Sequence, residues 1–186
     1  TLFSNDFIQR LLNVGRSEAP AAVGSVICDE TSPDKLLSIG AILDPWRLRV
    51  RDKLSDTRLC SSVNGLYSVD ALSGRGTLYP TDAFRMAGTM RPVLLPHYLA
   101  DYELAVRVKK AGFKLLVTED AKVLSSEEFG NAYLATGLLN KFFSIRSAYY
   151  LPAVLAFWWS MSSFFEKLTL IPRLIFVALK SKLLSS

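Results

Sequence analysis

The chain has 186 residues, of which 50% are apolar and 21% charged, enough for one domain with a core of its own. Its net charge of +5 is uneven: residues 1–140 carry equal numbers of basic and acidic side chains, whereas residues 141–186 carry six basic side chains and one acidic one. These 46 residues also hold 10 of the 21 aromatic side chains. A basic, aromatic and apolar tail favours an anionic membrane surface as partner and argues against nucleic acid.

Cys28 and Cys60 are the only cysteines, and neither belongs to a C-x-x-C pair. The spacing therefore indicates neither a zinc site nor a disulfide framework. We expect two buried thiols in a reducing compartment. No secretory signal peptide opens the chain, and its first residue is Thr rather than Met, so we expect a fragment or a processed product.

Short strands dominate the first part of the chain. Apolar spacing over residues 7–14 predicts a helix that Gly15 closes. A turn at 29–34 and a polar loop at 51–62 interrupt the strands, and Asp44-Pro45 is the expected turn of a hairpin. The strands predicted here cover residues 1–4, 21–28, 36–43, 46–50 and 66–72.

Helices and strands alternate in the second part. Helices are predicted over residues 80–86, 101–111 and 131–144, and strands over 113–117 and 121–124. Gly112 supplies a left-handed cap for the second helix. The alternation predicts a mixed α/β fold. Gly74 and Gly76 are followed by Tyr79 where the dinucleotide fingerprint needs glycine, and no Walker A motif occurs, so neither nucleotide-binding signature is present.

Two carboxylates, Asp101 and Glu103, lie at the start of the helix predicted for residues 101–111. Acidic residues are favoured in a first helical turn by the helix dipole, by about 0.3–1 kcal/mol each, which explains the pair without any function. The functional alternative is that Asp101 is a general base that faces a cleft. Spacing alone favours the first explanation.

The residues around this pair change that balance. The stretch D-Y-E-L-A-V-R-V-K-K-A-G-F, followed by D-A-K-V, resembles the second half of the catalytic domain of family 2 glycosyltransferases, which have the GT-A fold. The resemblance implies that Asp101 is the catalytic base and that Glu103 matches the second acid of the family, which is more often Asp. The family commonly has an acid before the base, where this chain has Ala100.

A glycine-containing loop and a short wall segment complete the site that the resemblance implies. Gly74-Arg75-Gly76-Thr77 matches the loop that faces donor and acceptor, although a tight turn between two elements is the simpler explanation of a lone G-x-G. The segment that contains His97 and Tyr98 lies just before Asp101. His97, the only histidine, is by itself more often a surface or packing residue than a catalyst.

Asp6 is the candidate ligand for a divalent cation. The GT-A fold places an acidic element after a strand, where it binds Mg²⁺ or Mn²⁺ on the nucleotide diphosphate, and hard oxygen ligands suit these ions. Here only Asp6 is acidic and Phe7 follows it, so a helix N-cap is the competing interpretation. Ser125 stands near a position at which many family members have His.

By analogy with the family, the protein moves a sugar from a nucleotide-diphosphate donor to the hydroxyl of a glycan or lipid-linked acceptor, with inversion, in cell-surface glycan or polysaccharide synthesis. Asp101 would take the acceptor proton, and the cation and Arg75 would offset charge on the leaving diphosphate. Residues 1–140 would be the C-terminal portion of the GT-A domain, without the half that binds the nucleotide base. The alternative is a membrane-anchored remnant or interaction module without catalysis.

Residues 141–186 would form apolar helices at the cytoplasmic face of the cell membrane. The 19 residues of 147–165 carry no charge, which is about the minimum for a span, but Pro152 and four serines weaken that prediction. Tyr and Trp side chains favour the interfacial layer. We expect helices in the membrane interface, with a true span and a buried packing helix as alternatives.

Overall fold

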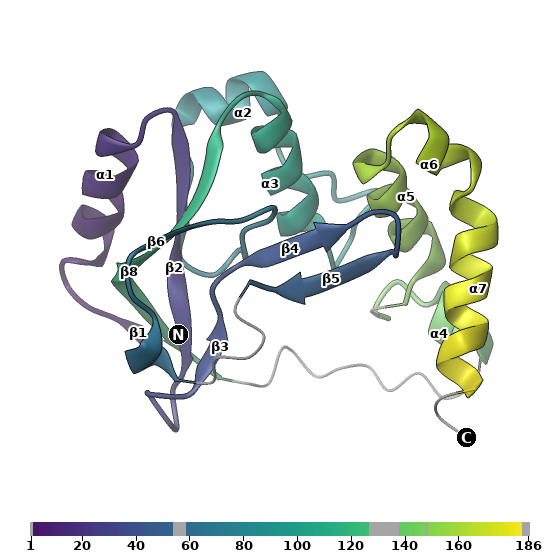
Figure 1. The fold of residues 1–186 in the computed structure, drawn as a ribbon, viewed down its shortest axis with the longest axis horizontal. Helices are drawn as coiled ribbons and strands as arrows, with labels where there is room; N and C mark the ends of the chain where they lie inside the picture. The colour runs from purple at the N-terminus through teal and green to yellow at the C-terminus, as the bar shows by residue number, and fades with distance from the viewer. Residues whose placement is uncertain (1, 54–58, 127–137, 148, 184–186) are drawn as a thin grey trace.

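The computed structural model describes residues 2–53, 59–126, 138–147 and 149–183. They form a mixed α/β fold, as the sequence predicts, with a six-stranded sheet in which β1, β8, β2 and β3 follow one another, β6 pairs with β8 and β7 with β2. A separate hairpin joins β4 and β5 (Figure 1). The strands are β1 Leu2–Phe3, β2 Ala21–Asp29, β3 Leu36–Ser38, β4 Ala41–Asp44, β5 Arg49–Asp52, β6 Leu66–Ser68, β7 Thr77–Leu78 and β8 Lys114–Ser125.

The parallel pair β2 and β8 is the centre of the sheet. All nine residues of β2 are buried, the continuous apolar pattern of a strand that is covered on both faces. Its register with β8 runs from Ala21 opposite Lys114 to Asp29 opposite Ser125, so both strands end at the same edge of the sheet. The two strands predicted at 113–117 and 121–124 are one strand, whose pairing shifts register where Thr118 gives way to Lys122.

Seven helices surround this sheet in the described residues, together with the 3₁₀ turn η1 Cys60–Ser62. Figure 1 shows α1 on one side of the sheet, α2 and α3 over it, and α5 to α7 at the far end. The helices are α1 Phe7–Ser17, α2 Thr81–Ala87, α3 Ala100–Lys110, α4 Leu138–Phe143, α5 Leu151–Met161, α6 Phe164–Leu168 and α7 Leu170–Leu183.

Several helices and strands begin or end at residues other than those predicted from the sequence. Helix α1 passes through Gly15 and ends at Ser17, so Gly15 is not its cap, whereas Gly112 has the expected left-handed conformation after α3, at φ 97°. The predicted hairpin forms, but only from Ala41 onward. Residues 36–38 pair with β2 instead, because Gly40, at φ 88°, turns the chain between the two segments. Part of the helix predicted at 131–144 and of the loop predicted at 51–62 lies outside the described residues.

The first helix of the tail belongs to the main core. Phe157 and Trp158 of α5 are buried together with Leu104 and Val108 of α3, and Leu170 of α7 joins the same cluster. A smaller cluster around Phe7 and Leu11 seals α1 against β2 and β8. Side chains of α5 and α7 therefore share the main core, and one face of α5 is a packing surface.

The two cysteines are bonded to each other, which corrects the expectation of two free thiols. Cys28 lies at the end of β2 and Cys60 in η1, and both are buried. Backbone pairing between Lys35 and Leu59 and a hydrogen bond from Cys60 N to Asp34 O bring the two segments together. A separation of 32 residues in sequence gives no sign of this contact.

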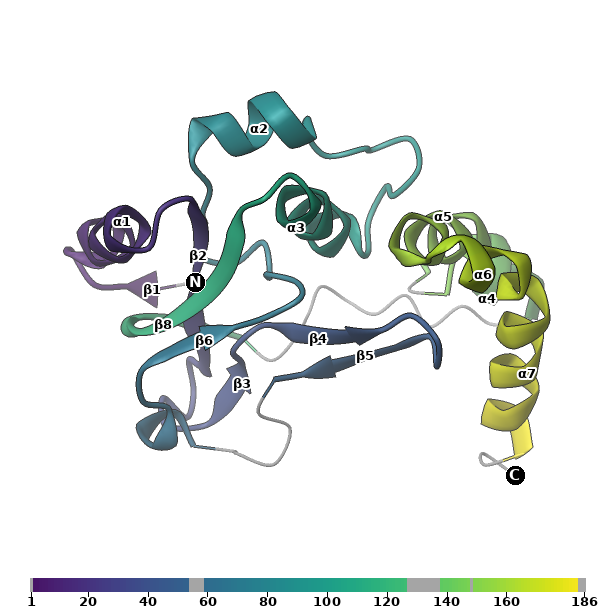
Figure 2. The same cartoon turned by 45° about the horizontal axis from the view of Figure 1, so that its top comes forward.

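The outer surface of the tail stays apolar. The exposed side chains include Trp159, Phe164, Phe165, Leu168, Ile171, Ile175 and Phe176. Within the described part of the chain, none of the helices has both the length and the apolar character that a membrane crossing requires. In Figure 2 the β4–β5 hairpin extends towards these helices, and Arg173 of α7 donates hydrogen bonds to Pro45 O and Trp46 O at 2.7 and 2.8 Å.

Candidate functional site

The start of α3 and the turn before β7 meet at Asp101. Leu99 precedes α3 and has a left-handed backbone conformation, at φ 68°. This conformation directs the start of the helix towards the turn that contains Gly74. Gly74 N donates a hydrogen bond of 2.8 Å to Asp101 Oδ2, and Tyr102 N donates one of 2.8 Å to Oδ1. Asp101 is half-buried, so its carboxylate is fixed by two backbone donors while it remains accessible.

Tyr79 and Tyr102 lie close to Asp101, and Asp52 lies close to Tyr102; sequence reasoning missed all three. Burial and the negative charge of Asp101 raise the pKa of Tyr79. Burial raises the pKa of Tyr102 to about 12, with further contributions from Asp101 and Asp52 and an opposing one from Arg75. Both hydroxyls therefore stay protonated at neutral pH and can donate hydrogen bonds. Two tyrosines beside a candidate base were the available signal.

Arg75 connects this region to the carboxyl ends of the central strands. Its Nη1 donates to Ser125 Oγ at 2.9 Å and to Ser126 O at 3.3 Å. Ser125 lies opposite Asp29 where β2 and β8 end. In open α/β sheets, ligands bind outside the carboxyl ends of parallel strands, so this half-buried guanidinium has the position of an anion-binding group.

Gly76 and Thr77 have structural reasons for their identity. A Cβ on Gly76 would lie 2.4 Å from Ser25 Oγ and 2.7 Å from a methyl of Val123, and its φ is 66°. Thr77 pairs with Gly24 of β2, and its hydroxyl donates to Ser73 O at 2.6 Å. The glycine therefore allows close packing against β2 and β8, where the sequence suggested close approach to a ligand.

Glu103, which the sequence suggested as a substrate-binding residue, is buried against two arginines. Only 1% of its surface is exposed, and Arg107 contacts both carboxylate oxygens at 2.8 to 3.0 Å. Arg107 also donates to the carbonyl oxygens of Ala87 and Thr89, and Arg91 lies 3.4 Å from Glu103. Glu103 therefore anchors the segment between α2 and α3 to the helix.

His97 and Tyr98 lie in that anchored segment. His97 is exposed and Tyr98 is half-buried. Both are a few residues before Asp101, as the sequence implies. Their role in binding an acceptor stays a prediction.

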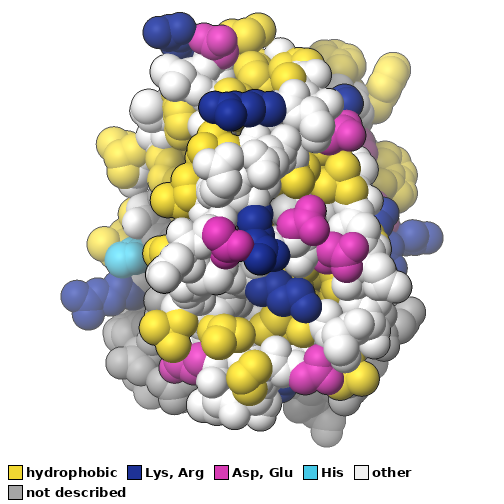
Figure 3. Space-filling model, turned by 90° about the vertical axis from the view of Figure 1, so that its left-hand side faces the viewer, with side chains coloured by type: hydrophobic (Ala, Val, Ile, Leu, Met, Phe, Trp, Pro, Cys, Tyr) yellow, Lys and Arg dark blue, Asp and Glu magenta, His cyan; other side chains and the backbone are white. Residues whose placement is uncertain are grey.

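Asp6 directly precedes α1. On the side of the molecule drawn in Figure 3, acidic and basic side chains lie next to one another. Asp6 forms an ion pair of 2.7 Å with Arg10, and Ser4 Oγ donates to its carboxylate at 2.6 Å. These bonds from Ser4 and Arg10 hold the pKa of Asp6 below its ordinary value. Arg10 also donates to Asp120 O, which draws this pair towards the middle of β8 and away from its carboxyl end.

This arrangement does not fit a divalent cation on Asp6. A cation would compete with the guanidinium of Arg10 for the same carboxylate, and hard cations are bound by several oxygen ligands. No group of three or more His, Cys, Asp or Glu side chains suited to a metal ion occurs among the described residues. We derive no catalytic step from a metal at Asp6.

Two pockets lined by described residues lie elsewhere. One is lined by residues of β4, α3 and α5, and the other by residues around α1 and the middle of β8, including Glu18 and Asp120. Neither lining includes Asp101 or Arg75. The expectation that these two side chains open onto one cleft stays a prediction.

No family model matches the sequence, and none of the curated proteins compared with it matches either. The local geometry of the described residues joins Asp101 to Gly74, places Tyr79 and Tyr102 near Asp101, and brings Arg75 to Ser125 at the carboxyl end of β8.

Proposed function

We propose that the protein is part of a glycosyltransferase of the GT-A type, which moves a sugar from a nucleotide diphosphate to an acceptor hydroxyl. The observation that carries the proposal is the contact between Gly74 N and Asp101 Oδ2. It joins the two motifs on which the resemblance to family 2 glycosyltransferases rests, the glycine-containing turn and the start of α3. The two are 27 residues apart in sequence.

The proposed reaction uses Asp101 as the general base. Each oxygen of a carboxylate can accept two hydrogen bonds, so Oδ1 and Oδ2 each keep a lone pair beside their backbone donor. The acceptor hydroxyl gives its proton to Asp101 as its oxygen attacks the anomeric carbon, and the bond between that carbon and the diphosphate oxygen breaks. Attack on the face opposite the diphosphate inverts the configuration.

The neighbouring side chains support the two charges of this reaction. Arg75 is a permanent cation beside the strand ends and would offset negative charge on the leaving diphosphate. The hydroxyls of Tyr79 and Tyr102 are protonated at neutral pH, as in any tyrosine, and burial raises the pKa of both further. They would orient sugar or acceptor oxygens. Sugar, nucleotide and acceptor follow from none of these groups.

A second candidate is a non-catalytic module of the same fold. It is favoured by Glu103 and Asp6, because two acidic residues expected to bind substrate or metal are instead held by Arg107 and Arg10. The two candidates differ in whether Asp101 has a chemical role.

The test is the release of nucleoside diphosphate from a panel of nucleotide sugars, with and without glycan and lipid-linked acceptors. Asp101→Asn should reduce turnover by roughly 10²–10⁴-fold, the usual range for a lost general base, and leave donor affinity nearly unchanged. Asp82→Asn, an exposed carboxylate at the start of α2, is the matched control and should have no effect. Both variants are measured in the complete enzyme, which includes the half that binds the nucleotide base. Turnover of Asp101→Asn within twofold of wild type would remove Asp101 from this role, and absence of transfer by the complete wild-type enzyme would favour the module.

The proposal includes a membrane surface as a partner of the tail. Its support is the row of exposed aromatic and aliphatic side chains on α6 and α7 and the net positive charge of residues 141–186. Apolar burial and attraction to anionic lipid act together in such helices. Because Phe157 and Leu170 are buried in the main core, deleting the tail would expose that core, so substitutions at the surface are the appropriate test.

A further inference from the structure

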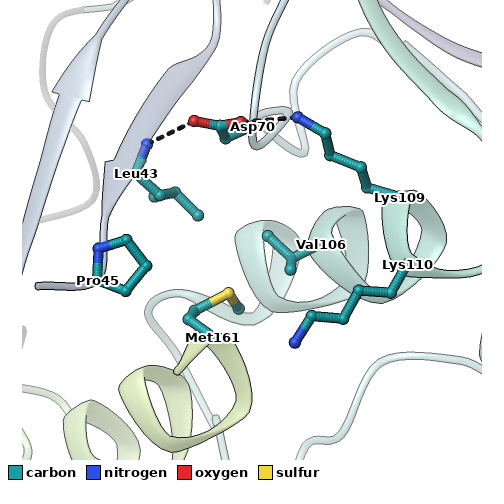
Figure 4. A pocket seen from close by; sticks show the side chains of 7 residues that line it. All are labelled: Leu43, Pro45, Asp70, Val106, Lys109, Lys110 and Met161. Atoms are coloured by element: carbon teal, nitrogen blue, oxygen red, sulfur yellow. Dashed lines mark hydrogen bonds and ion pairs between the residues drawn. The ribbon is translucent and has the colours of Figure 1, made fainter. Parts of the chain in front are cut away.

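A pocket of about 330 Å³ lies where the β4–β5 hairpin, α3 and α5 meet (Figure 4). Its walls are largely apolar and come from all three elements: Leu43 and Pro45 from the hairpin, Val106 from α3 and Met161 from α5. The volume is at the lower end of the range for small-molecule pockets. Its charged lining residues are Asp70, Lys109 and Lys110.

The two lysines of this pocket differ in their contacts: Lys109 is paired with a carboxylate, and Lys110 contacts a carbonyl oxygen. Lys109 Nζ lies 2.7 Å from Asp70 Oδ1, and the other oxygen of Asp70 accepts a hydrogen bond of 3.0 Å from Leu43 N. This pair fixes the hairpin to α3 and leaves little net charge. The described contact of Lys110 is with the carbonyl oxygen of Ser160. A carbonyl carries no net charge, so the ammonium keeps its positive charge and further N–H donors.

Tryptophans with basic partners stand near this pocket. Trp46 follows Pro45 in the hairpin, is 60% exposed, and has the guanidinium of Arg173 at 4.9 Å from its ring centre. Trp159 precedes Ser160, is 55% exposed, and has Lys167 Nζ at 5.4 Å. Tryptophan prefers the boundary between lipid and water, and basic side chains are attracted to anionic headgroups. These pairs suit a pocket that opens at a membrane surface.

We propose that this pocket binds one chain of an anionic phospholipid, with Lys110 paired to the phosphate of its headgroup. The chain would cover Leu43, Val106 and Met161, whereas a soluble sugar phosphate would leave its hydroxyls against these apolar side chains. The inference deepens the proposed membrane contact of the tail, on which it rests, and does not depend on glycosyl transfer. The lipid would fix the hairpin, α3 and α5 in one orientation at the membrane.

The experiment uses the full chain and a short-chain phosphatidylglycerol below its micelle concentration, titrated by calorimetry. Wild type should bind one molecule per chain. Lys110→Gln should weaken binding about fivefold, the effect of one basic residue at an anionic lipid surface. Lys122→Gln, an exposed lysine of β8 outside the pocket lining, is the charge-matched control and should change affinity less than twofold. Leu43→Trp should fill the pocket and abolish binding. If the Leu43→Trp variant does not fold, Lys110→Gln still tests the proposed lipid site.

The inference would be overturned by no binding of the short-chain lipid, by equal binding of short-chain phosphatidylcholine, or by equal losses in Lys110→Gln and Lys122→Gln. Inorganic phosphate that binds as tightly as the lipid would show a phosphate site without a chain and would also overturn it. Because the lipid is monomeric, the titration needs neither vesicle association nor enzymatic turnover. A negative result for glycosyl transfer or for vesicle binding by the tail can therefore be distinguished from a negative result for lipid binding in the pocket.

Discussion

Replacement of Glu103 separates its structural role from the substrate-binding role that the sequence suggested. Glu103→Gln removes the negative charge that the buried Arg107 faces, since only 13% of the Arg107 side chain is exposed. Breaking a buried pair by removing one partner costs about 3–5 kcal/mol. Arg107 keeps the carbonyl oxygens of Ala87 and Thr89 as acceptors, so we expect a loss near the lower limit, about 3 kcal/mol.

The measurement is the free energy of unfolding from urea titration, followed by circular dichroism. A loss of this size should also lower Tm by roughly 6–12 °C for a chain of this length. Arg91→Gln is the control, because Arg91 is half exposed and 3.4 Å from Glu103, and it should cost about 0–1 kcal/mol. A Glu103→Gln variant within 1 kcal/mol of wild type, with a weakened affinity for acceptor, would refute the structural assignment.

Two further predictions concern packing and the tail. Gly76→Ala should lower the free energy of unfolding in urea by about 2–4 kcal/mol, because the new Cβ would overlap Ser25 and Val123 at a positive φ. The control is Gly65→Ala, at φ 93° with no atom within 4 Å of the new Cβ, which should cost only about 1–2 kcal/mol for the left-handed backbone. Equal costs would contradict the packing at Gly76. Phe164→Ser combined with Phe165→Ser should reduce cosedimentation with anionic vesicles at least tenfold, which corresponds roughly to the free energy of burying one aromatic side chain. The control Val93→Ser, at a side chain 91% exposed on the segment after α2, should not change cosedimentation. Unchanged sedimentation of the double variant would remove these side chains from the membrane contact.

Local pattern was enough to predict much of the fold. The continuous apolar run at 21–28 and the amphipathic run that ends before Gly112 set β2 and α3, because burial on both faces of a strand and on one face of a helix leaves a period in the sequence. The mixed α/β class followed from their alternation. The closeness of Asp101 to the turn at Gly74 was implied by resemblance, and the hydrogen bond between them gives it a geometry.

Only the tertiary structure decided which side chains share an environment. Asp52, Tyr79 and Tyr102 come from separate segments of the chain. The influence of Asp101 on the pKa of both tyrosines, and of Asp52 on that of Tyr102, depends on distances that no spacing encodes. The bond between Cys28 and Cys60 likewise depends on how η1 returns to the end of β2. An acidic residue in the first turn of a helix gives the same sequence pattern whether its side chain faces a ligand or an arginine. The sequence therefore could not distinguish the role of Asp101 from that of Glu103. Burial distinguishes them: Glu103 is 1% exposed and paired with Arg107, whereas Asp101 stays half-buried and accessible.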